Sequence, residues 1–421
     1  MMKVAAYPTY DSYRDSGVKW IGEVPEGWNV KRLKHLVRQV SDKVSSKESP
    51  LRYIGMENVE SWSGHLIDGN AEVEGLAAKF APNDVIFGKL RPYLAKTTKL
   101  HFTGICSTEF IVFRARGGIE PDFLAYLLRS PDFVSYIDSS TYGSKMPRAN
   151  PNFIANCSIV APSFPEQRAI AAFLDDKCAK IDEAVRIKEA QIVLLRERRQ
   201  ILIQEAVTRG LNPDAPIKDS GIDWIGQIPA HWEVTKLKYA ADIFRGKFTH
   251  RPRNDPQLYD GAYPFFQTGD VARAGMFLSE FKQTLNEKGL RVSTLIPKGT
   301  ILITIAANIG DVAILGIDGC FPDSVVGFKP KTMVERDFLY YSMSSMKRIF
   351  LDSSIANAQA NLNVDRIGAI AFCIPPRNEQ ATIINYIAIA NRKISDGITI
   401  KQAQITALKE YKTCLINAAV T

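Results

Sequence analysis

The stretch DSGVKWIGEVPEGWNVKRLK, residues 15–34, recurs as DSGIDWIGQIPAHWEVTKLK at residues 219–238. Both copies share the pattern W-I-G-x-[VI]-P-x-x-W, which begins at Trp20 in the first copy and at Trp224 in the second. A long pattern that occurs twice indicates a chain built from duplicated units. The chain of 421 residues is also long enough for two or three domains, each with its own apolar core.

A second repeat begins at Glu166-Gln167 and again at Glu379-Gln380. Its apolar residues alternate at spacings of four and three, which is typical of a long helix with one apolar seam. The seam residues are Leu174, Cys178, Ile181, Val185, Ile192, Leu195, Leu202 and Ala206 in the first copy, and Ile387, Ile394, Ile398, Ile405, Leu408, Leu415 and Ala419 in the second. Lys188 and Arg199 occupy the seam positions that Lys401 and Lys412 occupy in the second copy. Matching seams favour two helices packed on each other over two helices that each lie on their own domain.

The segments between the first pattern and the helix differ more between the halves. Both contain β-like runs, at 84–87 and 110–113 and again at 300–303 and 325–328, each pair followed by a short helical stretch at 122–126 or 337–341. Asn150-Pro151 is interpreted as a turn into a strand over 154–160. The expected fold class is α+β, with two α/β globules alternating with two long helices in a pseudo-twofold repeat. The expected boundaries are an N-terminal segment at 1–24, globules at 25–160 and 228–374, helices at 161–209 and 375–421, and a linker at 210–227.

The formal net charge of +8 favours a negatively charged partner. Nucleic acid is the better candidate than a membrane, because no stretch approaches the roughly 20 apolar residues that span a bilayer, and no signal peptide is recognisable. A cytoplasmic location is therefore expected. The six cysteines form no C-x-x-C pair and the histidines do not cluster near them, so neither a metal site nor a disulfide framework is expected.

Motifs for catalysis are missing from the sequence. It contains no G-x-G and no G-x-x-x-x-G-K-[ST], which disfavours dinucleotide binding, methyl transfer and ATP hydrolysis in this chain. Asn150-Pro151-Asn152-Phe153 lacks the second proline of the N-P-P-[FY] motif of amino-methyltransferases. We therefore expect a chain without its own active site, cofactor or metal.

Basic residues with polar and aromatic neighbours gather in both globules, as expected where side chains neutralise phosphates and contact base edges. Arginine and lysine suit guanine, and asparagine and glutamine suit adenine. A solvated charged face is the alternative for any one of these residues. The DNA-binding candidates are Lys89, Arg91, Lys96, Lys145, Arg148 and Asn150 in the first globule, and Arg245, Lys247, His250, Arg251, Arg253, Gln267, Thr268, Gln359, Asn361 and Asn363 in the second.

The repeated tryptophans lie in the constant part of each half, which favours packing or partner docking over stacking on bases. Residues that read a sequence should differ between the halves, as the globules do. The docking candidates are Trp20, Trp28, Glu166, Gln167, Trp224, Trp232, Glu379 and Gln380. Ala388 and Ile389 stand where the first helix has Asp175 and Asp176, so the two docking surfaces are not expected to be identical.

The repeated tryptophan pattern, the two Glu-Gln helix starts and the duplicated order resemble the specificity subunits of type I restriction-modification systems. The resemblance implies two target recognition domains that each read one half of a bipartite double-stranded DNA site. It also implies an antiparallel coiled coil that acts as a ruler between the half-sites. Two methylation subunits would bind S-adenosylmethionine, and through them two restriction subunits would bring ATP and Mg. The whole complex would methylate adenine-N6 and cleave DNA in phage defence. A stand-alone DNA-binding regulator with the same fold is the alternative.

Overall fold

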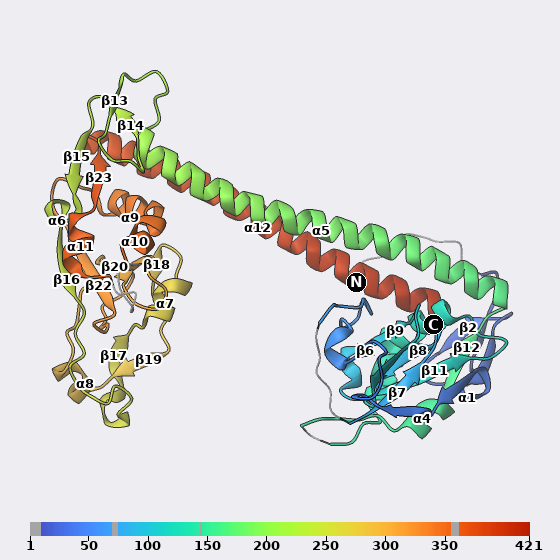
Figure 1. Ribbon diagram of the computed structural model, residues 1–421. Helices are drawn as coiled ribbons and strands as arrows, with labels where there is room; N and C mark the ends of the chain where they lie inside the picture. The colour runs from blue at the N-terminus through green and yellow to red at the C-terminus, as the bar shows by residue number, and fades with distance from the viewer. Residues whose placement is uncertain (1–9, 70–74, 144, 355–361) are drawn as a thin grey trace. The chain divides into compact units, whose positions relative to one another are not determined.

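The computed structural model describes residues 10–69, 75–143, 145–354 and 362–421. The chain divides into two compact units, unit 1 within Met1–Ala190 and Lys401–Thr421 and unit 2 within Gln191–Ile400. Each unit therefore combines one globule with part of each long helix (Figure 1).

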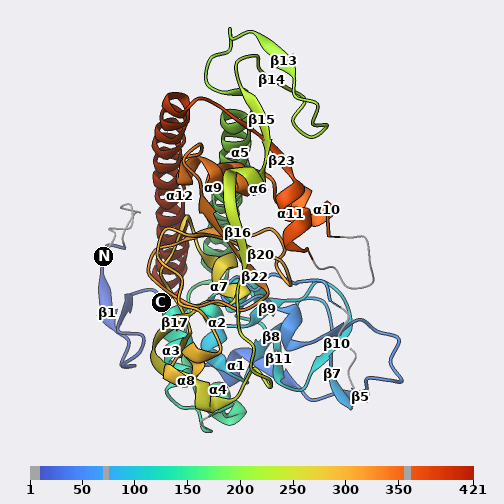
Figure 2. The same cartoon turned by 90° about the vertical axis from the view of Figure 1, so that its left-hand side faces the viewer.

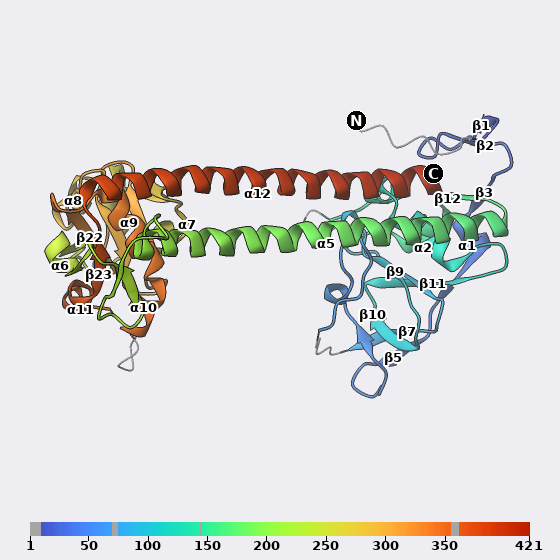
Figure 3. The same cartoon turned by 90° about the horizontal axis from the view of Figure 1, so that it is seen from above.

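The two long helices are α5 (Phe164–Arg209), of 46 residues, and α12 (Arg377–Val420), of 44 residues. In unit 1, Asp182 contacts Lys412 and Lys188 contacts Gln404. In unit 2, Arg199 donates a hydrogen bond to Ser395. Partner numbers on α12 fall as those on α5 rise, so the helices run antiparallel side by side, as Figures 1 and 3 show. The prediction of paired long helices is confirmed.

Unit 1 contains two four-stranded sheets, with strand orders β4-β11-β8-β9 and β5-β7-β10-β6. The first is antiparallel throughout, and β10 and β6 pair in parallel in the second. The elements that precede α5 are β1 (Tyr13–Asp15), β2 (Glu23–Pro25), β3 (Asn29–Arg32), α1 (Leu33–Leu36), β4 (Val37–Val40), β5 (Lys43–Ser45), β6 (Tyr53–Ile54), η1 (Met56–Asn58), β7 (Leu76–Phe80), β8 (Val85–Gly88), η2 (Pro92–Leu94), β9 (Thr97–Lys99), β10 (Gly104–Ser107), β11 (Phe110–Ala115), α2 (Pro121–Arg129), α3 (Pro131–Asp138), α4 (Pro151–Asn156) and β12 (Ser158–Ala161).

Unit 2 contains a five-stranded sheet with the order β16-β22-β20-β21-β18 and a separate β17–β19 pair. Strands β16, β20 and β22 of this sheet lie together in Figure 2, and β17 lies apart from them. Strand β22 lies between β16 and β20, as β11 lies between β4 and β8 in unit 1. The elements between α5 and α12 are β13 (Ile217–Asp219), β14 (Gln227–Pro229), β15 (Glu233–Lys236), α6 (Leu237–Ala240), β16 (Ala241–Arg245), η3 (Pro256–Leu258), β17 (Tyr259–Phe265), α7 (Thr268–Arg273), β18 (Phe277–Leu278), β19 (Gln283–Leu285), α8 (Glu287–Arg291), β20 (Ile301–Thr304), β21 (Val312–Leu315), β22 (Val325–Pro330), α9 (Arg336–Ser345), α10 (Lys347–Asp352), α11 (Val364–Ala369) and β23 (Ala371–Ile374).

The repeated pattern folds in the same way in both units. In unit 1 it forms the β1–β2 hairpin and then β3, which pairs with β12. In unit 2 it forms the β13–β14 hairpin and then β15, which pairs with β23. The segment 210–227, expected as a linker, thus includes β13 and the start of β14, and its Ile225 is buried.

The strand predicted over 154–160 is wrong at its start. Residues Pro151–Asn156 form the short helix α4, and the strand β12 begins at Ser158. The Asn150 side chain accepts a hydrogen bond from the backbone N–H of Asn152 at 2.9 Å, and Pro151 begins the helix. An asparagine cap followed by proline starts a helix as readily as a turn, because proline has no N–H to lose there.

Both long helices contribute to the core of each unit. The core of unit 1 includes Leu415, Ile416 and Val420 from the end of α12, together with Trp28 and Leu174. The core of unit 2 includes Ala206 and Val207 from the end of α5. No helix within the described ranges combines the length and the apolar character that crossing a lipid bilayer requires.

Candidate nucleic-acid interface

Most of the basic candidates of unit 1 come together where β8 ends. The backbone N–H of Arg91 donates to the Pro147 carbonyl at 2.7 Å, and that of Ala149 donates to the Lys89 carbonyl at 2.9 Å. These bonds align residues 89–91 with residues 147–149, and Leu90 and Arg148 form an isolated β-bridge. The structure thus brings Lys89, Arg91, Lys145, Arg148 and Asn150 to one edge of the globule.

Not all of these side chains are free to meet a ligand. The Arg148 guanidinium donates two hydrogen bonds to the Glu109 carboxylate, at 3.1 and 3.2 Å, and this bonding raises the pKa of Arg148. Asn150 uses its side-chain oxygen to cap α4. Lys96 donates to the carbonyls of Met56 at 2.6 Å and Val59 at 2.8 Å. The ammonium group of Lys96 thus fixes the backbone around η1, and its contact with DNA stays a prediction.

In unit 2 the arginines of the predicted set gather at one residue, Asp323. The Nε of Arg245 donates to the Asp323 backbone carbonyl at 2.5 Å, and Arg251 lies 3.5 Å from the Asp323 carboxylate. Arg253 also pairs with this carboxylate. His250 contacts Asp255 at 3.1 Å, while Lys247 is exposed. The run 245–253 thus presents a cationic surface with Asp323 inside it.

Gln267 and Thr268 lie at the start of α7, beside the same turn. The backbone N–H of Phe266 donates to the Cys320 carbonyl at 2.8 Å, and that of Lys247 donates to the Phe321 carbonyl at 3.1 Å. Residues 320–323 therefore lie between Gln267 and the arginine cluster. The side-chain amide of Gln267 donates a hydrogen bond to Gln283 at 3.1 Å. Asn363 caps α11, and Gln359 and Asn361 lie outside the described residues.

Two of the docking candidates are buried glutamines that fasten a helix start to its globule. Gln167, fully buried, accepts from the Glu120 N–H at 2.8 Å and donates to the carbonyls of Gly118 and Pro162. Gln380 repeats this arrangement with the Glu335 N–H at 2.7 Å and with two carbonyls, those of Met333 and Pro375. Both glutamines therefore have a role inside the fold, and their contact with a partner stays a prediction.

The glutamates beside them have different partners in the two units. Glu166 accepts hydrogen bonds from the Trp28 indole at 3.0 Å and from the Tyr10 hydroxyl at 2.5 Å. Burial and this carboxylate raise the pKa of Tyr10 to about 12. Glu379 instead contacts His231 at 2.7 Å.

The four repeated tryptophans pack within their own units. Trp28 and Trp232 are buried, Trp20 stacks on Tyr136, and Trp224 packs against the core of unit 2. This arrangement fits the predicted packing role. Docking of a partner on the exposed parts of Trp20 and Trp224 stays a prediction.

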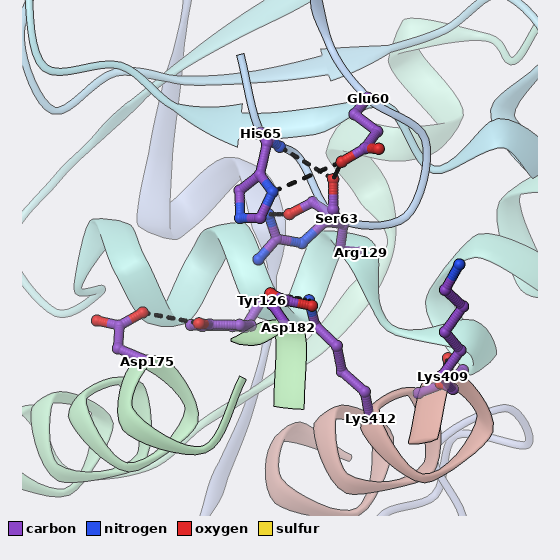
Figure 4. Close-up of polar contacts among 10 residues, drawn as sticks. Glu60, Ser63, His65, Tyr126, Arg129, Asp175, Asp182, Lys409 and Lys412 are labelled. Atoms are coloured by element: carbon purple, nitrogen blue, oxygen red, sulfur yellow. Dashed lines mark hydrogen bonds and ion pairs between the residues drawn. The ribbon is translucent and has the colours of Figure 1, made fainter. Parts of the chain in front are cut away.

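A polar cluster that the sequence did not reveal lies between α2 and the helix pair in unit 1 (Figure 4). Tyr126 donates to Asp175 at 2.7 Å, and Lys412 contacts Asp182 at 2.7 Å. Arg129 donates to the Ser63 carbonyl at 2.7 Å, and burial lowers its pKa. Desolvation and the Asp175 hydrogen bond raise the pKa of Tyr126. These groups line a cavity of about 260 Å³, in which the opposite charges are largely paired.

The described residues contain no group of three or more histidine, cysteine or acidic side chains placed to hold a metal ion. The five buried thiols and the exposed thiol of Cys414 are all free of disulfide bonds.

Residues 229–412 match the type I restriction modification DNA specificity domain. The chain is 25% identical over 430 residues to the putative type I restriction enzyme MjaX specificity subunit of Methanocaldococcus jannaschii, covering 95% of this chain and 94% of that protein. It is 26% identical over 435 residues to the MjaVIII specificity subunit of the same organism, covering 94% and 93%.

Both of these relatives are type I restriction enzyme specificity subunits, and the chain is similar to them along nearly its whole length. A solved structure from a study of assembly and conformational transition in the type I restriction-modification system has the same fold, with a TM-score of 0.74 at 20% identity. The match covers 94% of this chain and 98% of that one. The likeness covers 94% of the chain, so the shared fold includes both globules and both long helices and not unit 2 alone.

Proposed function

We propose that this chain is the DNA-recognition subunit of a type I restriction-modification complex and reads the two halves of a bipartite site. The observation that carries the proposal is the duplication itself. Both units place cationic side chains beside the turn that precedes corresponding strands, β11 in unit 1 and β22 in unit 2. The residues of these surfaces differ, as expected for two readers of different half-sites.

The same proposal assigns the chemistry to partner subunits. The chain would have no active site, and two methylation subunits would bind S-adenosylmethionine and methylate adenine-N6. Two restriction subunits, held through the methylation subunits, would use ATP and Mg to cleave DNA. The absence of G-x-G and of G-x-x-x-x-G-K-[ST] from the sequence supports this division of labour. A cytoplasmic location, where the DNA is, follows from the same role.

The antiparallel helices would act as the ruler between the half-sites. A helix rises about 1.5 Å per residue, so one heptad adds about 10 Å, close to the length of three base pairs. Insertion of one heptad into both α5 and α12 is expected to lengthen the spacer in the methylated site.

Methylome sequencing tests the proposal. A host that expresses this chain with its methylation subunits is expected to gain one bipartite adenine-methylated motif, which is lost when this chain is omitted. The motif would supply both half-sites at once. Methylation that does not depend on this chain, or DNA binding by the chain without methylation subunits at a site that is never methylated, would contradict the proposal and favour a stand-alone regulator.

A further inference from the structure

In each unit, one carboxylate pairs with at least one of the candidate DNA-binding arginines. In unit 1 this is Glu109, directly before β11, which pairs with Arg148. In unit 2 it is Asp323, two residues before β22, which pairs with Arg251 and Arg253. The two carboxylates thus occupy nearly the same place in two globules whose other polar residues differ.

The ion pairs lie at the surface and contribute little to stability. The Asp323 side chain is 31% exposed, and those of Arg251 and Arg253 are 54% and 47% exposed. Exposed ion pairs are screened by solvent and salt, and many have no measurable effect on folding. A contribution to folding stability therefore does not explain why both units have an acid at this position.

The pairs do fix the direction of the arginine side chains. A guanidinium group is a planar fork that binds carboxylate or phosphate through two parallel hydrogen bonds. Glu109 holds Arg148 in this forked arrangement, with both of its hydrogen bonds near 3.1 Å. An arginine held by one edge keeps its remaining N–H groups at a set position, so less side-chain entropy is lost when DNA binds.

The carboxylates also lower the attraction of each surface for DNA of any sequence. Phosphate contacts dominate non-specific binding, and each cation that meets a phosphate adds to it. Asp323 competes with phosphate for two arginines, and its backbone carbonyl accepts from a third, Arg245. DNA whose bases do not match gains too little elsewhere to offset the loss of these contacts.

We propose that Glu109 and Asp323 are arginine-positioning residues that increase discrimination between the matching DNA site and other DNA. This inference rests on the proposed function. It adds that the acids, rather than the cations alone, set the ratio of specific to non-specific binding at each half-site.

The test uses the full chain with its methylation subunits and three variants in unit 2: Asp323→Asn, Asp323→Glu, and the control Asp242→Asn. Asp242 forms an exposed pair with Lys331 at 3.4 Å, outside the arginine cluster, so its replacement changes the net charge equally. Affinity is measured from low to high salt for a duplex with the methylated motif and for one with both half-sites scrambled.

Asp323→Asn is expected to bind the scrambled duplex about two- to fivefold more tightly than Asp242→Asn does, the range that the loss of an exposed ion pair allows. Its salt slope on that duplex should become steeper by about 0.9, one added phosphate contact. The affinity of Asp323→Asn for the matching duplex should not rise. Asp323→Glu, which keeps the carboxylate, should retain most of the discrimination between the two duplexes. Glu109→Gln, compared with Asp68→Asn at the exposed Arg52 pair, should act likewise in unit 1.

Equal effects of Asp323→Asn and Asp242→Asn on scrambled DNA would overturn the inference while leaving the proposed function intact. A wild-type complex that does not distinguish the two duplexes would instead refute the proposed function, and the inference with it. Unfolding midpoints of all variants should agree with wild type, and a large drop for Asp323→Asn would show that Asp323 serves folding and would also overturn the inference.

Discussion

The junctions between globule and long helix differ between the two units in an instructive way. Gln167 and Gln380 make the same three backbone hydrogen bonds in the same buried setting. About four helical turns further along each helix, unit 1 pairs Asp182 with Lys412, whereas unit 2 pairs Ser395 with Arg199. The residue is the same in both units where its side chain bonds to buried backbone groups. It differs where its side chain bonds only to another side chain.

The buried glutamines should give the largest effect on stability. Gln167→Ala and Gln380→Ala each remove three hydrogen bonds and leave buried backbone groups without partners. We expect each to lower the free energy of unfolding by about 2–4 kcal/mol. Urea denaturation followed by tryptophan fluorescence measures this, because Trp28 in unit 1 and Trp232 in unit 2 are both buried. The exposed Gln200→Ala is the control.

Equal losses for the two variants would agree with equivalent junctions. A loss below about 1 kcal/mol, or one confined to a single unit, would show that the shared hydrogen bonds are not what fixes the helix starts.

Exchanging Asp182 and Ser395 between the two helices should change the free energy of unfolding by less, and with opposite signs in the two units. Asp182→Ser leaves the Lys412 ammonium, which is 14% exposed, without its carboxylate, and should destabilise unit 1 by about 1–3 kcal/mol. Ser395→Asp offers a carboxylate to Arg199, whose Nε is buried without a partner among the described residues, and should stabilise unit 2 by up to about 1 kcal/mol. Denaturation of both variants and of the double variant checks this. Destabilisation by Ser395→Asp would show that the unit 2 site excludes a charge.

The smallest expected effect on the protein comes from chemical labelling of its one exposed thiol. Cys414 on α12 is exposed, whereas the other five cysteines are buried. Burial raises the pKa of Cys106, Cys157 and Cys373 to about 12, so at pH 8 almost none of these thiols is in the reactive thiolate form. A thiol reagent at pH 8 should react rapidly with one group in native protein and with six in urea. Cys414→Ser should abolish the fast reaction, and a second fast thiol would contradict the core packing of one unit.

The two long helices and their pairing were predictable because the apolar residues of each helix recur with a regular spacing. The seam of Leu174, Cys178 and Ile181 and that of Ile387 and Ile394 lie buried where the sequence places them. The recurrence of glutamine at positions 167 and 380 showed that the residue matters in both units. It did not show whether the glutamine bonds within the fold or contacts a partner, because either role would keep the same residue.

The site was less predictable because its contacts join distant residues. Lys96 was predicted to contact DNA, and the sequence did not reveal that it also binds the carbonyls of Met56 and Val59, 40 and 37 residues away. Glu109 and Asp323 matter only through arginines 39 and 70 or more residues away, so neither stood out. The one available signal was an acid shortly before the β-like runs at 110–113 and 325–328.

The central claim is that each unit reads one half of a bipartite DNA site. The most direct measurement is methylome sequencing of a host in which residues 25–160 of this chain are replaced by the same region of a relative. The account predicts that one half-site changes while the other half-site stays the same. Alteration of both half-sites in a complex that still methylates DNA would contradict it, because the two units would then not read independently.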